Sequence, residues 1–202
     1  MFKYRPEDVD CRYCTDYSRK HGCRSAHCPY LSERIEAGVV GYGEAVAETF
    51  KAVPAIRYRL AYLTSTFPGT MWSDGGHERR MNAVSYYAGH NRKRDTNEYF
   101  AALYLLSADR DLYRRTMSCH NRSTIRFEKA HRRGISTRGY TLLGAAKTIY
   151  LGTNDLTPED LTNTEIIDTD TFRLIINALL IVRYGVNALE ITQGRSHKWD
   201  DG

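Results

Sequence analysis

Four of the five cysteines lie between residues 11 and 28, in the pattern Cys11-x2-Cys14-x8-Cys23-x4-Cys28. Inside cells thiols stay reduced, so such a cluster is more typical of a metal site than of disulfides. Zinc takes about four thiolate or imidazole ligands in a tetrahedron, and a Cys-x2-Cys turn supplies two of them without strain. The sequence therefore predicts a zinc ion held by Cys11, Cys14, Cys23 and Cys28.

The ligand set and the metal stay open at this point. His21 and His27 lie within reach of the cluster, so either imidazole can replace one cysteine. Pro29 directly follows Cys28, so an iron–sulfur cluster is a competing interpretation, as is a loop without metal. Zinc with four protein ligands has no open position for water or substrate, and we therefore expect a structural site. The fifth cysteine, Cys119, is expected to be a buried or incidental thiol.

Beyond residue 30 the sequence has the apolar periodicity of helices. Apolar residues recur at intervals of three and four from Leu31 to Phe50, which predicts a helix weakened or kinked by its glycines. Further helices are expected after Pro54, over 77–88, over 95–106, after Asp109, over 137–151 and over 171–184, with residues 65–76 as a loop. The last of these helices is apolar nearly all round, which indicates a place in the core.

We therefore predict a mainly α fold without any sheet beyond one small hairpin near the metal. The expected divisions are a four-cysteine zinc knuckle (1–30), a helical domain (31–185) and a C-terminal tail (186–202). Several helix ends carry the residues that close them. Caps are predicted at Asp95 (with Glu98 as a capping box), Asp109, Ser136 and Asp168 or Asp170, and stops at Gly152 and Gly185.

The formal net charge of +5 is distributed unevenly along the chain. Counting Asp, Glu, Lys and Arg gives +1 for residues 1–37, +3 for 38–95, +6 for 96–150 and −5 for 151–202, which together give +5. We predict that the basic stretch, residues 110–138, binds phosphates or an acidic protein surface. The competing interpretation is a solvated face that pairs with the acidic C-terminal quarter. The arginines concerned are Arg114, Arg115, Arg122, Arg126, Arg132 and Arg133.

Other function classes find little support in the sequence. The N-terminus is charged without an apolar core, and no apolar run approaches the ~20 residues that a membrane span needs. We therefore expect a cytoplasmic protein without membrane contact. The triplets His90-Asn91-Arg92 and His120-Asn121-Arg122 are similar to fragments of metal-dependent nuclease sites, but no second ligand group stands at a suitable spacing. No nucleophile signature or phosphate loop is present, so we do not expect an enzyme.

Three segments, Glu98–Ser107, Leu142–Gly152 and Asp170–Tyr184, resemble a small helical domain of phages and mobile elements of Gram-positive bacteria. The segment Cys11–Tyr30 resembles a zinc knuckle placed ahead of that domain. Together they resemble zinc-containing anti-CRISPR proteins, which inhibit the type II CRISPR nuclease Cas9. The shared positions are mostly core positions, and the resemblance supplies no catalytic residue.

The resemblance implies a stoichiometric protein that binds the Cas9–guide RNA complex in a bacterial host cell and keeps target DNA from loading. Because the chain is net basic, we expect contact with an acidic protein patch or a moving recognition lobe. A decoy for DNA is the weaker expectation, since only residues 151–202 have the charge to mimic phosphate. The alternative is a zinc-containing, nucleic-acid-binding accessory protein of a mobile element that uses the basic stretch on phosphates.

Overall fold

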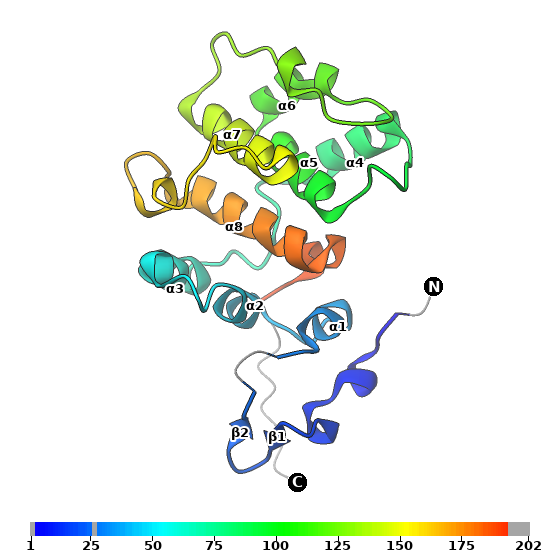
Figure 1. Ribbon diagram of the computed structural model, residues 1–202, viewed down its shortest axis with the longest axis vertical. Coiled ribbons are helices and arrows are strands. Elements are labelled where there is room, and N and C mark those ends of the chain that lie inside the picture. Colours follow the sequence, from blue (N-terminus) through cyan, green and yellow to red (C-terminus); the bar gives the residue numbers. More distant parts are fainter. Residues whose placement is uncertain (1–2, 26–27, 194–202) are drawn as a thin grey trace. The chain divides into compact units, whose positions relative to one another are not determined.

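The computed structural model describes residues 3–25 and 28–193 (Figure 1). Over these residues the protein is mainly helical, and its one sheet is a two-stranded hairpin, so the expected fold class is confirmed in its helical character. The chain divides into two compact units. Unit 1 is Met1–Thr70 with Glu190–Gly202, and unit 2 is Met71–Leu189. The divisions expected at residues 30 and 185 stay a prediction.

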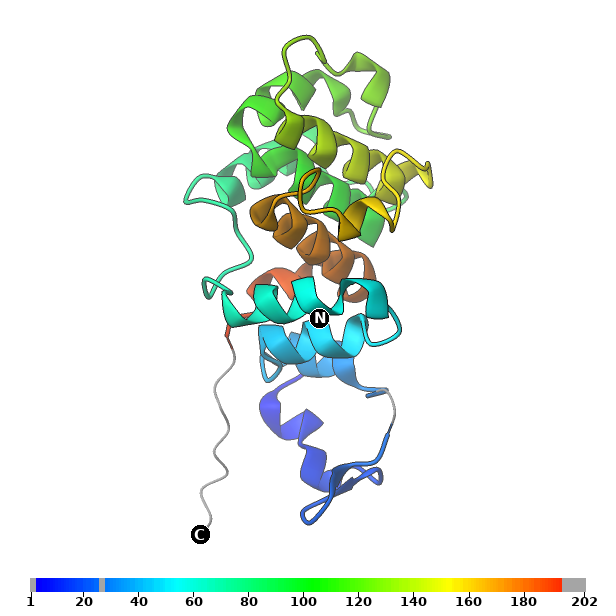
Figure 2. The ribbon, with the colours of Figure 1, turned by 90° about the vertical axis from the view of Figure 1, so that its left-hand side faces the viewer.

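Unit 2 is a helical bundle built around α5. Its helices are α4 (His77–Ala88), α5 (Asn97–Ala108), α6 (Arg110–Thr116), α7 (Thr137–Leu151) and α8 (Thr169–Tyr184), with short 3-10 turns η4 (Met117–Cys119), η5 (Phe127–Lys129) and η6 (Asp160–Thr162). Helix α5 contacts α4, α6, α7 and α8, as Figure 2 shows. Every residue from Ala101 to Ala108 is buried, because α5 is apolar on all sides. Helix α8, predicted to be in the core, packs against both α5 and α7.

The helix ends follow the predicted chemistry in most cases. Asp109, Ser136 and Asp168 each accept a hydrogen bond from the backbone N–H three residues on, as N-caps do. Gly152 ends α7 in the left-handed region, with φ of +68°. These caps satisfy backbone groups that would otherwise lack partners at the helix ends.

The predicted capping box at the start of α5 is wrong. Thr96, not Asp95, is the N-cap, and its hydroxyl accepts from the N–H of Tyr99 at 3.2 Å. The carboxylate of Asp95 is already engaged, because it forms a buried ion pair with Arg94 at 2.5 Å. A charged partner in the core therefore decides which of the two neighbouring residues caps the helix.

A buried hydrogen-bond network fixes the segment before α4 to α5 and α8. The hydroxyl of Tyr104 donates to the carbonyl of Met71, and the amide of Asn177 donates to the same carbonyl at 3.1 Å. The ring of His77 accepts from the N–H of Ser73 at Nδ1 (3.1 Å), and its Nε2 lies 2.8 Å from the carbonyl oxygen of Tyr104. The loop predicted over 65–76 is confirmed, and this network anchors its second half.

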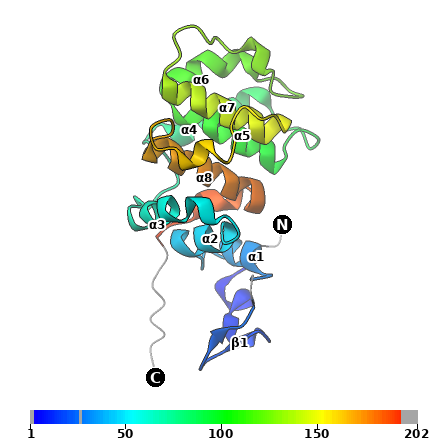
Figure 3. The ribbon, with the colours of Figure 1, turned by 60° about the vertical axis from the view of Figure 1, so that its left-hand side comes forward.

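Unit 1 combines both ends of the chain. Its elements are η1 (Pro6–Val9), η2 (Cys11–Tyr13), β1 (Tyr17–Ser18), β2 (Gly22–Cys23), α1 (Leu31–Glu36), α2 (Tyr42–Thr49), η3 (Pro54–Ile56) and α3 (Arg57–Ser65). Helices α2 and α3 pack together (Figure 3), and the rings of Tyr42 and Phe67 stack with centroids 3.8 Å apart. The returning segment is bound by two hydrogen bonds, Tyr42 N–H to Thr192 O at 2.9 Å and Gln193 Nε2 to Phe67 O at 3.0 Å.

The helix predicted over residues 31–50 is interrupted rather than kinked. Helix α1 ends at Glu36, and Gly38 adopts φ of +70°, a conformation that costs glycine little. Gly41 is extended and precedes α2, which begins at Tyr42. The apolar spacing is preserved across the break, so Leu31 and Val46 are both buried although they belong to separate helices.

Candidate functional site

The four clustered cysteines come from short elements of unit 1. Cys11 begins η2, and Cys14 follows it and donates its N–H to the carbonyl of Cys11 at 3.0 Å. Cys23 lies on β2, paired with Tyr17 of β1, and its side chain is exposed. Cys28 precedes α1, and its N–H donates to Glu48 at 3.1 Å. None of the five cysteines forms a disulfide.

Three of these thiols share one electrostatic environment with Arg34. Burial is the largest effect and raises the pKa of Cys11; Arg34 opposes it, and the neighbouring Cys28 and Cys14 thiols add to it. The guanidinium of Arg34 lies 3.9 Å from the sulfur of Cys28 and forms an ion pair with Glu44 at 2.6 Å. The raised pKa keeps Cys11 protonated, so a zinc ion would have to displace this proton, and the positive charge of Arg34 lowers that cost.

The fit to a zinc ion is therefore partial. Among residues 3–25 and 28–193, no group of three or more His, Cys, Asp or Glu side chains is arranged closely enough to hold a metal ion. His21 is exposed, and its backbone N–H donates to Ser18, whereas His27 lies outside the described residues. The zinc site therefore stays a prediction.

The predicted binding arginines lie on unit 2 and differ in exposure. Arg115 is half-buried, pairs with Asp111 at 2.5 Å and donates to the carbonyl of Arg133 at 2.6 Å. It therefore links α6 to the loop before α7 and has a structural role. The remaining five are exposed to solvent: Arg114, Arg122, Arg126, Arg132 and Arg133.

Pairing with the acidic C-terminal quarter accounts for little of this basic surface. Lys147 pairs with Asp155 at 2.5 Å, and this hydrogen bond is the main reason why the pKa of Asp155 is lowered; Arg132 makes a small electrostatic contribution. Within the described part of the chain, none of the five exposed arginines lies within 4.0 Å of a carboxylate. Most of their charge is consequently available to a partner.

The structure brings the two His-Asn-Arg triplets together, which the sequence did not indicate. The amide of Asn91 donates to the carbonyl of Arg122 at 2.7 Å, and the buried Arg94 donates to the carbonyl of Asn121 at 3.0 Å. Burial, and to a lesser extent Arg94, lowers the pKa of His120 to about 4. A buried guanidinium at the centre of this cluster disfavours a metal cation there, since like charges repel strongly away from water.

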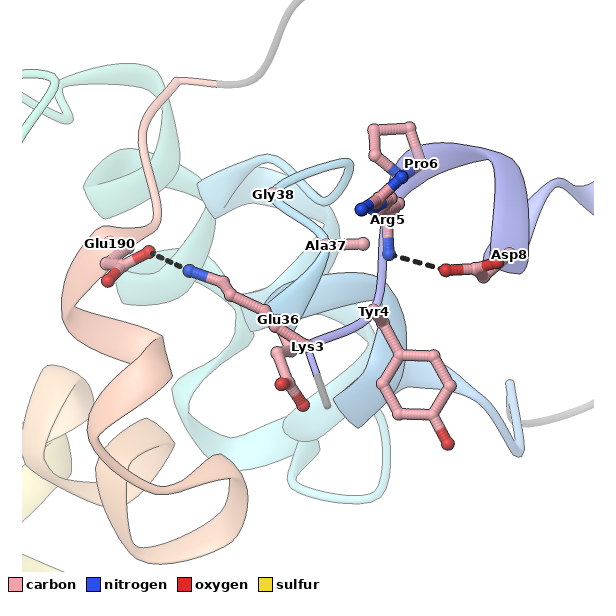
Figure 4. Close-up of a pocket in the computed structure, with 9 residues that line it drawn as sticks. All are labelled: Lys3, Tyr4, Arg5, Pro6, Asp8, Glu36, Ala37, Gly38 and Glu190. Carbon is pink, nitrogen blue, oxygen red and sulfur yellow. Dashed lines mark hydrogen bonds and ion pairs between the residues drawn. The ribbon is translucent and has the colours of Figure 1, made fainter. Parts of the chain in front are cut away.

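The open cavities of the described surface include one in each unit. One is in unit 1, has a volume of about 730 Å³, and carries both charge signs (Figure 4). Its Lys3 pairs with Glu190 at 3.3 Å, and the backbone N–H of Arg5 donates to Asp8 at 2.9 Å, so three of its charged side chains have a partner within the cavity. The other lies between α4 and α6 of unit 2, where Arg79 and Arg110 join Arg114. The sequence analysis did not single out Arg79, which is far from the basic stretch in the chain.

Comparison with protein-family models, with curated proteins and with solved structures finds no match to this chain. Among the described residues, no helix is both long and apolar enough to span a lipid bilayer.

Proposed function

We propose that this protein inhibits the type II CRISPR nuclease Cas9 by binding the nuclease–guide RNA complex stoichiometrically and preventing target DNA from loading. The observation that carries this proposal is the exposed surface of unit 2. Its five exposed arginines lack carboxylate partners in the described structure, and it exposes Tyr86, Tyr87 and Tyr140 to 91%, 69% and 63%. Arginine and tyrosine are the residues that most often dominate binding at protein interfaces.

The acidic quarter of the chain supports contact with protein over imitation of DNA. Three of its carboxylates are engaged locally, with Asp155 paired to Lys147, Asp168 capping α8, and Asp170 paired to Arg173 at 3.2 Å. Carboxylates committed to caps and ion pairs are poor substitutes for a regular row of phosphates. The accessible charge of unit 2 is therefore mainly positive, which favours an acidic patch on the partner.

The proposal includes a structural zinc ion held by Cys11, Cys14, Cys23 and Cys28. A closed tetrahedral site would stabilise the short elements of residues 11–28, which bury few apolar side chains of their own. The role of these residues is to order the N-terminal segment, with no part in a reaction.

The test combines a purified Cas9–guide RNA complex with increasing amounts of the protein. We expect co-elution at a fixed ratio and loss of target DNA binding in a mobility shift assay. Reversing the charge at Arg126 and Arg133 with the double variant Arg126→Glu/Arg133→Glu should weaken inhibition by more than about tenfold. The matched control, Arg92→Glu/Lys93→Glu, changes the same charge on exposed residues of unit 2 outside the basic stretch. Unaltered target binding at excess protein would exclude this function.

A second function, a nucleic-acid-binding accessory protein, is favoured by the same unpaired arginines acting on phosphates. If all five contacted duplex DNA, affinity should fall roughly 500-fold between 50 and 200 mM salt, because about 0.9 counterion is released per phosphate. A mobility shift with duplex DNA alone distinguishes the two functions. Binding without any effect on the nuclease would select this second function, and no shift at low salt would exclude it.

A further inference from the structure

The cavity between α4 and α6, here named the α4–α6 groove, concentrates positive charge at a place that the basic stretch alone does not explain. Its walls include Asp74, Arg79, Arg80, Arg110, Tyr113 and Arg114, all in unit 2. It is open to solvent and has a volume of about 710 Å³. Sites of roughly 300–1,000 Å³ accept a ligand of small-molecule size, such as one or two nucleotides of a strand.

Arg80 and Asp74, which both line the groove, compensate each other's charge. Arg80 donates to the carbonyls of Ser107 at 2.7 Å and Ala108 at 3.1 Å, and pairs with Asp74 at 2.8 Å. Hydrogen bonding from Arg80 is the main reason why the pKa of Asp74 falls to about 2. The Asp74 carboxylate is therefore compensated, and it adds little repulsion toward an anion.

Three other guanidinium groups are uncompensated. Within the described residues, the side chains of Arg79, Arg110 and Arg114 make no hydrogen bond and no ion pair, and all three are exposed. Arg110 and Arg114 stand four positions apart on α6, on one helix face, where like charges destabilise the helix slightly. On the neighbouring face of α6, Asp111 and Arg115 also stand four positions apart, but they have opposite charges and form an ion pair at 2.5 Å.

The side chains present favour nucleic acid over an acidic peptide. Guanidinium groups bind phosphate oxygens in a planar, two-pronged geometry, and Tyr113 supplies a half-buried aromatic ring beside them. Positive grooves with an aromatic ring are typical of sites for single strands, where bases stack on the ring. A flexible single strand can place one or two nucleotides inside a cavity of about 710 Å³, whereas a rigid duplex could contact only its rim.

We propose that the α4–α6 groove binds the backbone of single-stranded nucleic acid, with Arg79, Arg110 and Arg114 on phosphates and Tyr113 stacked under a base. Occupation of this site needs no nuclease, so it can be tested apart from inhibition. The site shares Arg114 with the duplex binding considered above and differs from it in using Arg79 of α4 and the ring of Tyr113.

The test measures fluorescence anisotropy of labelled twelve-nucleotide oligo(dT) and oligo(U) with the full-length protein in 50–200 mM salt. Arg79→Gln/Arg114→Gln should weaken binding on the order of tenfold or more. It should also reduce the slope of log affinity against log salt concentration by about 1.4, because each of the two lost phosphate contacts contributes about 0.7. The matched control, Arg92→Gln/Lys93→Gln, removes the same charge from exposed positions outside both the groove and the basic stretch and should change affinity less than about threefold.

Three results would overturn the proposal: no binding by the unaltered protein at 50 mM salt, equal losses in both double variants, or displacement of the oligonucleotide by a twelve-residue polyglutamate at equal concentration. If thermal melting shows that the groove variant is unfolded, Arg110→Gln alone provides the same comparison. The nuclease is absent from the assay, so failure here leaves the inhibition proposal standing, and failure of inhibition leaves this one standing.

Discussion

Two buried histidines should make unit 2 sensitive to mild acid. His77 is fully buried, and its Nδ1 accepts from the N–H of Ser73. The ring is therefore neutral with its proton on Nε2, which donates to the backbone carbonyl of Tyr104. Burial lowers the pKa of His77 from 6.5 to about 4, and the pKa of His120 falls to the same value. The Nδ1 of His120 is buried and has no hydrogen-bond partner among the described residues.

The sign and size of the effect follow from proton linkage. Between pH 6.5 and 4 the unfolded chain binds more protons at these rings than the folded chain, so acid favours unfolding. A pKa of about 4 in the folded state and about 6.5 when unfolded gives a loss of roughly 1.8 kcal/mol per histidine between pH 7 and pH 5. The nearby Asp74 adds almost nothing in this range, because its pKa is 3.8 when unfolded and about 2 when folded, so its stabilising effect is lost only below about pH 5.

The assay is urea unfolding followed by circular dichroism at pH 7, 6 and 5. We expect the unaltered protein to lose roughly 3.6 kcal/mol of unfolding free energy across this range, and His77→Gln to lose about half as much. The variant should also be less stable at pH 7, because it loses two buried hydrogen bonds. His131→Gln is the control, since His131 is exposed and should leave the pH dependence unchanged. Parallel pH profiles for the unaltered protein and His77→Gln would refute this reasoning.

Three further outcomes test other parts of the structure. Arg94→Ala should lower the unfolding free energy by about 3–5 kcal/mol in urea titrations, because it removes the buried guanidinium that pairs with Asp95 and donates to the carbonyls of Ala88 and Asn121. Arg92→Ala on the surface should change it by less than about 0.5 kcal/mol. Gly43→Ala should raise the melting temperature by stabilising α2 by about 0.5–1 kcal/mol, since its added methyl group meets open space. Elemental analysis should find one zinc per chain, lost in Cys14→Ser and retained in Cys119→Ser; unaltered protein without zinc would contradict the predicted site.

Much of the fold could be predicted because local rules determine its helices. The N-caps Asp109, Ser136 and Asp168 could be predicted, because each side chain needs only the backbone N–H three residues later in the sequence. The start of α5 could not be predicted, because Asp95 pairs with the buried Arg94 and does not cap the helix. Arg94 in turn donates to the carbonyl of Asn121, which is distant in the sequence. Long-range contacts of this kind leave no periodic signal in the chain.

The candidate sites divide in the same way. The basic stretch was visible because its charges are contiguous, yet the sequence could not tell that Arg115 supports a loop while Arg114 faces solvent. The α4–α6 groove was not visible, because it pairs Arg79 with a helix that begins thirty-one positions later at Arg110. The cysteine spacing predicts a metal strongly, and the described geometry leaves that prediction to experiment.

The discontinuity of unit 1 affects how the protein is made. Tyr42 donates to Thr192 and Phe67 accepts from Gln193, and these two partners are synthesised only after all of unit 2. At about 5–20 residues per second, translating residues 71–189 takes roughly 6–24 s, and residues 31–70 lack these two hydrogen bonds for that time. Unit 1 should therefore complete its hydrogen bonding only after the whole of unit 2 has been synthesised.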